Sequence, residues 1–354
     1  KGKMKMEKFA YIGCRPTKER KARGKGISVY KVDGDNWELV QILEGQVNPS
    51  YLCLNKAQDR LYSIHGDFCQ VSAFKIRENG TLEYLNTVKT YGTNPVHLTL
   101  DPEERWLYVA NLQTGSVSVI PVLEDGSLGK LHDLEFISGN GGPGYISHPH
   151  QTMKDRSGRW LVVPSQGRLQ GVGKLTVFAI DEEQGSLKET FIQKGRTGAE
   201  PRHCVFHPGN KYCYCVNEKD STVAAYDFDE KTGKLALNQL LTSLPEDYAG
   251  DGWASAIDIH PEGHTLYVSN RKHDSITVYH LDEATGNMTY IQNIKTGGEQ
   301  PRFITLNPEG TRLLAANELS DTITVFEILK DGTLKDTGRK IATESPVCIA
   351  WKTC

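Results

Sequence analysis

A segment repeats along the chain, and arginine, glutamate or histidine occupies two of its positions in several copies. One position follows the opening proline, and the other follows a strand-like run further along the segment. Arg202 follows the proline of EPRHCVFHP, and Glu218 follows the strand-like run YCYCVN. His150 and Arg271 hold the same two places in other copies of the segment. Guanidinium groups form paired hydrogen bonds with carboxylate or phosphate, and a histidine or a carboxylate can move a proton. These four residues predict a site for an anionic substrate.

The repeated segment predicts how these residues are positioned. Its clearest copies span residues 200–228 and 300–328, and each reads as a strand, a turn rich in Asp, Asn, Pro and Gly, a second strand, a polar turn and a third strand. A more variable fourth strand follows. The units open at Pro49, Pro95, Pro149, Pro201, Ala254, Pro301 and Pro346. Seven units of four strands are typical of a β-propeller blade pattern. We therefore expect an all-β chain in which residues 1–354 form a single seven-bladed β-propeller domain.

The two ends of the sequence complete one blade. After Pro346 only one strand-like run, VCIAW, remains, whereas the first part of the chain supplies KFAYIG, GISVYKV and WELVQIL. The prediction is a last blade that takes its first strand from the C-terminal end and its other three strands from the N-terminal end. Such a closed ring has no inner sheet edge left to pair, and a monomer is expected.

This topology places two rings of residues at one mouth of the central channel. In a four-stranded blade the first strand begins, and the second strand ends, at the same end of the sheet. The residues after the opening position are Ser50, Val96, His150, Arg202, Ser255, Arg302 and Val347. The residues after the second strand are Gly66, Leu112, Gln166, Glu218, Arg271, Glu318 and Arg15.

The polar members of both rings come from neighbouring blades. We expect Arg202, Arg271, Arg302 and Glu318 to bind substrate, together with His148 from SHPHQT. A structural interpretation stands beside this one. Arg202 with Glu218, and Arg302 with Glu318, hold equivalent places, so each pair could be a salt bridge within its blade. His150 could likewise be a satisfied channel histidine.

Composition excludes several classes of partner. The 354 residues carry a net charge of −3, are 38% hydrophobic and have a mean hydropathy of −0.46. No apolar run approaches the roughly 18 residues of a membrane span. We expect no nucleic-acid or membrane partner, and we interpret the basic run KERKARGK at 18–25 as a solvated loop.

The eight cysteines show no CxxC pair and no histidine at zinc-site spacing. Cys213 and Cys215 lie two apart, so on a strand they face the same side. We interpret the cysteines as buried free thiols, which favour a reducing compartment and a cytoplasmic location. No metal and no cofactor are expected.

Three segments resemble the lactonase family of seven-bladed propellers: SHPHQT, EPRHCVFHP with YCVNE, and WASAIDIHPEGHTLYVSNRKHDSITVY. That family includes bacterial 6-phosphogluconolactonases and the fungal 3-carboxy-cis,cis-muconate lactonising enzyme. The resemblance implies that His150, Arg202, Glu218 and Arg271 form the active site. One departure is PSQGRLQGVGK, where Ser165 and Gln166 replace the acidic turn of many members. Because this longer loop is expected to overhang the site, the departure bears on the identity of the substrate.

Lactone hydrolysis needs a base, a cation for the oxyanion and an acid for the leaving oxygen. His150 could be the base, or Glu218 could either orient His150 or activate the water itself. Arg202 and Arg271 would hold the oxyanion and the substrate's anionic group. The favoured reaction is conversion of 6-phosphogluconolactone to 6-phosphogluconate without a metal. The alternatives are a lactonising cycloisomerase of the carboxymuconate type and a non-enzymatic binding propeller.

Overall fold

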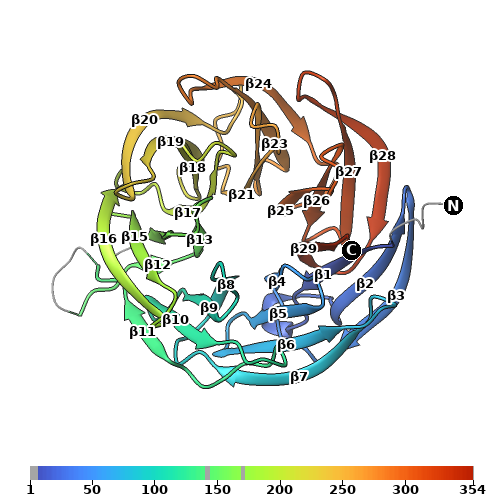
Figure 1. Ribbon diagram of the computed structural model, residues 1–354. Coiled ribbons are helices and arrows are strands. Elements are labelled where there is room, and N and C mark those ends of the chain that lie inside the picture. The colour runs from blue at the N-terminus through green and yellow to red at the C-terminus, as the bar shows by residue number, and fades with distance from the viewer. Residues whose placement is uncertain (1–6, 140–143, 169–171, 354) are drawn as a thin grey trace, which may run out of the picture.

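The strands form seven antiparallel sheets arranged radially around a central axis (Figure 1). The computed structural model describes residues 7–139, 144–168 and 172–353. The one helix that lies wholly within these residues is a short 3-10 turn, η1 (Lys18–Arg20), and none of the described helices could span a membrane. The architecture confirms the all-β, seven-bladed prediction.

Five blades are built from four consecutive strands, numbered outward from the axis. Blade one contains β4 (Leu52–Leu54), β5 (Arg60–His65), β6 (Gln70–Ile76) and β7 (Leu82–Lys89). Blade two contains β8 (Pro95–Leu100), β9 (Trp106–Asn111), β10 (Ser116–Pro121) and β11 (Asp133–Phe136). Blade four contains β17 (Pro201–Phe206), β18 (Tyr212–Asn217), β19 (Thr222–Asp229) and β20 (Lys234–Thr242). Blade five contains β21 (Ala254–Ile259), β22 (Thr265–Asn270), β23 (Ser275–Leu281) and β24 (Met288–Lys295). Blade six contains β25 (Pro301–Leu306), β26 (Arg312–Asn317), β27 (Thr322–Ile328) and β28 (Leu334–Ala342).

Blade seven joins the two ends of the chain. Its strands are β29 (Pro346–Lys352), β1 (Lys8–Cys14), β2 (Gly26–Asp33) and β3 (Asn36–Glu44). β29 pairs antiparallel with β1, with Phe9 opposite Lys352, and Figure 1 shows the red strand beside the blue one. The predicted closure is confirmed, and hydrogen bonds of the sheet hold the ring together at this blade.

Blade three departs from the expected regular first strand. Its strands are β12 (His148–Pro149), β13 (Met153–Lys154), β14 (Trp160–Gln166), β15 (Lys174–Asp181) and β16 (Ser186–Lys194). Neighbouring blades bond to the chain between β12 and β13. The N–H of Cys204 donates to Gln151 Oε1 at 2.6 Å, and the N–H of Thr152 donates to His97 Nδ1 at 3.2 Å. These side-chain bonds interrupt the ladder, and His150 lies in the interruption.

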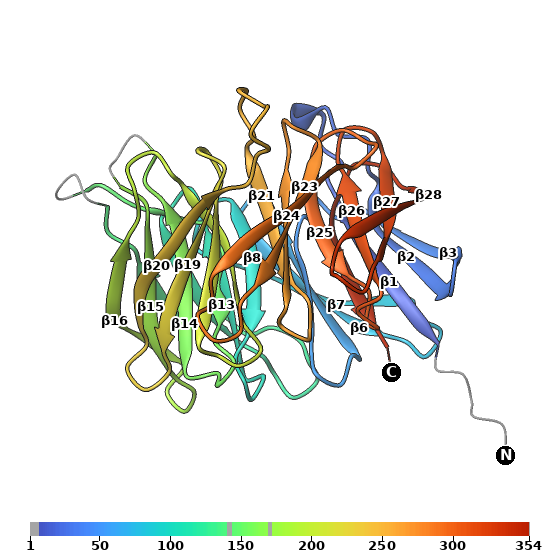
Figure 2. The ribbon, with the colours of Figure 1, turned by 90° about the horizontal axis from the view of Figure 1, so that it is seen from above.

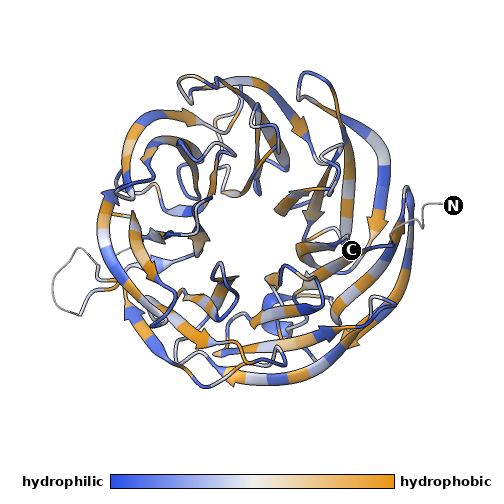
Figure 3. Cartoon of the chain, viewed as in Figure 1, coloured by the Kyte–Doolittle hydropathy of each residue, from blue (hydrophilic) through white to orange (hydrophobic). Residues whose placement is uncertain are grey.

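The core fills the spaces between adjacent blades. β18 is buried along its whole length, because sheets pack on both of its faces, whereas the outermost strand β20 is exposed or half-buried except at Leu235. Figure 3 shows the resulting mixture of hydrophobic and hydrophilic residues along the outer strands.

The cysteines of β18 belong to this core. Cys213 and Cys215 pack with Cys204 in one hydrophobic cluster, and the thiols of the described residues are free. Burial raises the pKa of Cys215, which keeps it protonated and unreactive. The buried-thiol prediction is confirmed for these three and for Cys14 and Cys348, while Cys53 and Cys69 are half-buried and Cys354 lies outside the described residues.

The two ends of the channel differ in their loops. The connection between β20 and β21 rises above the ring on the upper side of Figure 2, whereas the C-terminal end of β29 lies on the lower side. The upper side is where the first strands begin and the second strands end, so it carries the predicted mouth.

Candidate functional site

A main-chain hydrogen bond joins the two predicted rings. The N–H of Glu218 donates to Glu200 O at 2.8 Å, and the N–H of Arg271 donates to Trp253 O at 3.1 Å. Each acceptor residue precedes the opening position of its blade and has a left-handed backbone, with φ of 62° at Glu200 and 49° at Trp253. Such strained residues persist only where the surrounding structure fixes them. The bond therefore sets both rings at the same height.

A β-bulge aims the first ring into the channel. The register of β17 shifts between Pro201 and His203, and that of β25 shifts between Pro301 and Phe303. The extra residue of a bulge is free of the ladder and its side chain is redirected. In these two blades that residue is Arg202 or Arg302.

The mouth holds a cavity of about 380 Å³, a size suited to a small ligand. His150 and Gln166 form part of its wall. Among the described residues, the charged groups on the wall are five arginines and one carboxylate: Arg15, Arg20, Arg168, Arg271, Arg302 and Glu218. The excess of guanidinium groups makes the cavity electropositive, as binding of an anion requires.

Glu218 lies between two arginines. Its Oε2 is 3.1 Å from Arg202 Nε and 3.0 Å from Arg271 Nη2. Both contacts are ion pairs at hydrogen-bond distance. Arg202 is fixed from below, because its Nη1 donates to Ser255 O at 2.6 Å. The side chain of Arg202 is 4% exposed and that of Glu218 is 23% exposed, so the carboxylate covers the guanidinium and faces the cavity.

Glu218 is ionised at neutral pH. Burial by itself would raise its pKa, but the charges of Arg271, Arg202 and Arg302 outweigh burial and hold the pKa below its ordinary value. The cavity therefore contains a permanent carboxylate.

His150 is neutral. Burial, then the charges of Arg202 and His203, hold the pKa of His150 well below 6.5. Its ring packs against His203 with centroids 5.1 Å apart, and its Nδ1 is buried without a partner among the described residues. No hydrogen bond between described residues joins His150 to Glu218. The geometry therefore does not show Glu218 orienting His150, which was one of the two expected roles of that carboxylate.

A second Arg–Glu–Arg group stands two blades further on. Arg302 Nη1 lies 3.9 Å from Glu318 Oε2, whereas Arg15 Nη1 donates to Glu318 Oε1 at 3.0 Å and Gln300 Nε2 donates to Glu318 Oε2 at 2.8 Å. Burial, with the charge of Arg302, lowers the pKa of Arg15 to about 9. The side chain of Glu318 is 8% exposed, so in this group the carboxylate is covered and the guanidinium groups of Arg302 and Arg15 face the cavity.

Three predicted residues lie off the cavity wall for different reasons. Glu318 is covered within the second Arg–Glu–Arg group. Arg202 is directly beneath Glu218, within the same charged group. His148 is buried in β12, and its Nδ1 bonds to Leu112 O at 2.9 Å. The contact that the structure gives His148 is thus to the backbone of blade two.

Three arginines on the wall were not predicted as site residues. Arg15 belongs to the second ring and could have been chosen from its position. Arg20 comes from the basic loop that we interpreted as solvated, and its guanidinium donates to Asp67 Oδ2 at 2.7 Å beside the cavity. Arg168 follows β14 in the loop expected to overhang the site, of which residues 169–171 lie outside the described part. No periodicity in either loop indicated where these side chains point.

Aromatic rings close the channel below the mouth. Tyr51 and His97 pack with centroids 4.1 Å apart, and His203 and Phe303 both contact Tyr51. Burial lowers the pKa of His97 to about 3, so this ring is neutral. The cavity has a floor of uncharged rings, and no group of His, Cys, Asp or Glu within the described ranges could hold a metal ion.

Comparisons with known proteins agree with the seven-bladed fold. A family model described as "Lactonase, 7-bladed beta-propeller" matches residues 9–351. A Bacillus subtilis (strain 168) protein named 6-phosphogluconolactonase is 30% identical over 349 residues, or 97% of each chain. A Klebsiella pneumoniae (strain 342) protein of the same name is 31% identical over 330 residues, which cover 91% of this chain and 94% of that one. The solved structure of the Pseudomonas aeruginosa periplasmic gluconolactonase PpgL matches with a TM-score of 0.88 and 25% identity, over 98% of this chain and 99% of that chain.

Proposed function

Because this chain belongs to the lactonase family of seven-bladed β-propellers, we propose that it hydrolyses 6-phosphogluconolactone to 6-phosphogluconate. The observation that carries the proposal is a cavity in which a single described carboxylate, Glu218, faces five guanidinium groups. A carboxylate can activate water, and guanidinium groups can stabilise both a developing oxyanion and a fixed phosphate.

Glu218 is assigned as the base. It is ionised at neutral pH, and it takes a proton from the attacking water while the water oxygen bonds to the lactone carbonyl carbon. The carbonyl oxygen becomes an oxyanion beside Arg271, with Arg202 adding its charge from beneath Glu218. When the ring C–O bond breaks, Glu218 returns the proton to the leaving oxygen. One water is consumed, the proton that Glu218 took is returned, and the product is the open hydroxy acid.

His150 is assigned to position the water. Its low pKa keeps the ring neutral, and protonation would place an imidazolium ion beside Arg202 and Arg302. A neutral imidazole in the cavity wall can accept or donate one hydrogen bond without that cost.

The substrate's phosphate is assigned to Arg302 and Arg15, with Arg20 at the rim. These guanidinium groups belong to the second Arg–Glu–Arg group and its neighbouring loop. Planar guanidinium groups bind phosphate oxygens in pairs, which would orient the lactone carbonyl toward Glu218.

We further propose that the reaction needs no metal and that the protein works in the cytoplasm. The scheme uses side chains alone, so activity is expected to survive dialysis against a chelator. The free buried thiols support a reducing compartment.

A direct assay tests the proposal. Purified protein is mixed with 6-phosphogluconolactone, and acid release is compared with the spontaneous rate, alongside His150→Ala and Arg202→Ala. Circular dichroism and thermal melts check that the variants fold. A wild-type rate equal to buffer would exclude this substrate, and full activity in both folded variants would exclude this site.

A further inference from the structure

Each blade sends one turn onto the blade before it. In each blade a turn joins the third strand to the fourth. At six of the seven junctions, a glycine of this turn packs against a residue near the start of the second strand of the preceding blade. At each, a Cβ added to the glycine would lie 2.2–2.7 Å from that side chain. The pairs are Gly80 on Phe9, Gly126 on Arg60, Gly185 on Trp106, Gly233 on Trp160, Gly286 on Tyr212 and Gly332 on Thr265. Only glycine fits so close an approach at its left-handed φ.

Side-chain donors hold the main chain of these turns. Trp106 Nε1 donates to Glu182 O at 2.8 Å, and Trp160 Nε1 donates to Glu230 O at 2.8 Å. The turns are also acidic, and Arg159 Nη2 binds Glu230 Oε1 at 2.7 Å. Each such junction therefore binds an acidic turn that contains glycine, and a side-chain donor of one blade bonds to a backbone carbonyl of the turn. In blade three an arginine also pairs with a carboxylate of the turn.

The junction between blades six and seven lacks this contact. β2 ends at Asp33 and β3 begins at Asn36, so the turn consists of Gly34 and Asp35 alone. By the repeat, Gly34 should pack against Arg312, but a Cβ on Gly34 would have no atom within 4 Å. A cavity of about 350 Å³ occupies the place of the missing turn.

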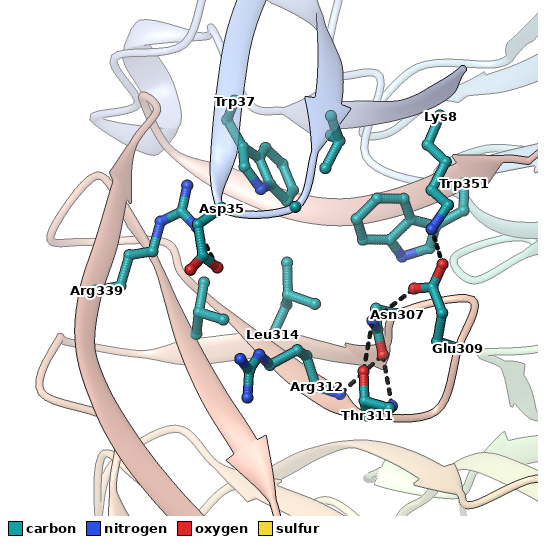
Figure 4. A pocket seen from close by; sticks show the side chains of 13 residues that line it. Lys8, Asp35, Trp37, Asn307, Glu309, Thr311, Arg312, Leu314, Arg339 and Trp351 are labelled. Atoms are coloured by element: carbon teal, nitrogen blue, oxygen red, sulfur yellow. Dashed lines mark hydrogen bonds and ion pairs between the residues drawn. The ribbon is translucent and has the colours of Figure 1, made fainter. Parts of the chain in front are cut away.

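The walls of this cavity carry the recognition groups (Figure 4). Trp37 and Trp351 lie on one side, packed edge to face with centroids 5.5 Å apart, and Leu314 and Arg312 lie on the other. Trp351 Nε1 is buried and has no hydrogen-bond partner among the described residues. The guanidinium of Arg312 is 3.7 Å from Glu327, too far for a hydrogen bond.

The remaining charges at the cavity are already neutralised. Lys8 pairs with Glu309, and Arg339 Nη1 lies 2.8 Å from Asp35 Oδ1. Figure 4 shows both pairs at the rim. The indole N–H of Trp351 thus has no partner among the described residues, and the guanidinium of Arg312 has only its 3.7 Å ion pair with Glu327. Together they resemble what Trp160 and Arg159 offer to the turn of blade four.

We propose that the junction of blades six and seven binds a surface turn of a partner protein, an acidic turn that contains glycine. The turn's carbonyl oxygen accepts from Trp351 Nε1, its glycine packs between Trp37 and Arg312, and its carboxylate pairs with Arg312. The cavity includes residues of the β25–β26 connection, at the end of the sheet opposite Gln300 and Glu318. It therefore lies on the face away from the mouth, and the site does not depend on the proposed lactonase activity.

The chain supplies its own probe. A cyclised hexapeptide with the sequence of residues 181–186, DEEQGS, presents the turn that fills the blade two–three junction. Protein labelled with ¹⁵N in tryptophan is titrated with this peptide, and the indole N–H signals are followed. The signals of Trp351 and Trp37 should shift saturably while that of Trp106, which already donates to Glu182, stays in place.

Matched variants decide the outcome. Trp351→Phe and Arg312→Ala should each weaken binding at least tenfold, whereas Trp106→Phe should bind as the wild type does. A peptide with valine in place of glycine, DEEQVS, should not bind. The proposal would be overturned if no signal shifted or if the Trp351→Phe variant bound the peptide as tightly as the wild type. Equal binding of the valine peptide would also overturn it, because the cavity would then accept any apolar group.

A graft tests the same idea within the chain. Replacing Gly34 and Asp35 by the four residues 230–233 of blade four, EKTG, should fill the cavity, raise Tm and abolish peptide binding with lactone hydrolysis unchanged. Peptide binding that persists in the folded graft would overturn the proposal. Because peptide binding and lactone hydrolysis are read separately, failure of one does not imply failure of the other.

Discussion

Two Arg–Glu–Arg groups stand at equivalent positions around the mouth, one spanning blades four and five and the other spanning blades six and seven. In both, the glutamate lies 3.0 Å from an arginine of the following blade. They differ in the arginine of their own blade, which is 3.1 Å from Glu218 but 3.9 Å from Glu318. In the first group the arginine is buried and the carboxylate is presented, whereas in the second the carboxylate is buried and the arginine is presented.

This difference shows how one repeated framework supplies two chemistries. The main-chain bond to the residue before each blade places both glutamates alike. The extra bond from Gln300 then holds Glu318 down, while the bond from Arg202 to Ser255 holds that arginine down and leaves Glu218 facing the cavity. A salt bridge within a blade and a catalytic role are thus compatible for blade four. The four predictions that follow test the contrast, from the largest expected effect to the smallest.

Glu218→Gln should lower kcat/KM for 6-phosphogluconolactone by roughly 10²–10⁴-fold, the usual contribution of a general base. Glu318→Gln is the matched control, and it should cost less than about tenfold because amide and carboxylate are similar in shape and Glu318 does not line the cavity. Steady-state kinetics on both folded variants measure the ratio. Equal losses would remove the functional distinction between the two groups.

Arg302→Ala should raise KM for the phosphorylated lactone by roughly 10–100-fold, since a hydrogen bond to a charged group contributes about 1.5–3 kcal/mol. The unphosphorylated lactone, assayed in parallel, should be affected by less than about threefold. Arg312→Ala, on the opposite face, serves as the control. Equal losses with both lactones would show that Arg302 does not bind the phosphate.

The pH profile identifies the base. Glu218 must be ionised to act, and its pKa lies below the ordinary 4.5 because its arginines outweigh burial. Activity should therefore persist as the pH falls to 4.5 and decline only below it. Arg271→Gln removes the strongest of these charges, so the pKa of Glu218 rises and the acid limb of kcat/KM should move to higher pH. Arg271 is not among the main influences on the pKa of His150, and an unmoved limb would instead point to His150.

Arg20→Ala should have the smallest effect, a rise in KM of roughly two- to fivefold, because an exposed charge that already pairs with Asp67 contributes little. Arg23, three residues later, binds Asp321 and does not line the cavity, so Arg23→Ala should leave KM unchanged. A larger loss from the Arg23 variant would mean that the loop acts through its conformation.

The fold could be predicted because every blade repeats the same local instructions. Strand alternation, turn residues and the opening proline recur in the sequence, and the incomplete blade at each end required a closed ring. The positions of His150, Glu218, Arg271 and Arg302 on the cavity wall followed from that topology, and the structure places all four there.

Other features depended on contacts that no local pattern records. Which partner faces the cavity in each Arg–Glu–Arg group is set by Ser255 and Gln300, whose bonds are made after the chain has folded. Arg20 and Arg168 come from loops without periodicity. The interrupted first strand of blade three is held by Gln151 and by His97 of the adjacent blade, neither of which signals a break in the sequence.

The pairing of β29 with β1 also dictates an order of events during synthesis. β1 leaves the ribosome among the first strands, yet its neighbour on the channel side is the last strand of the ring to be made. Until then β1 exposes an unpaired edge, and the largest sequence separation between paired strands of the described residues remains to be bridged. The seventh blade can therefore assemble only after translation has reached β29, so the mouth, which needs Arg15 beside Glu318, is completed in the same final step.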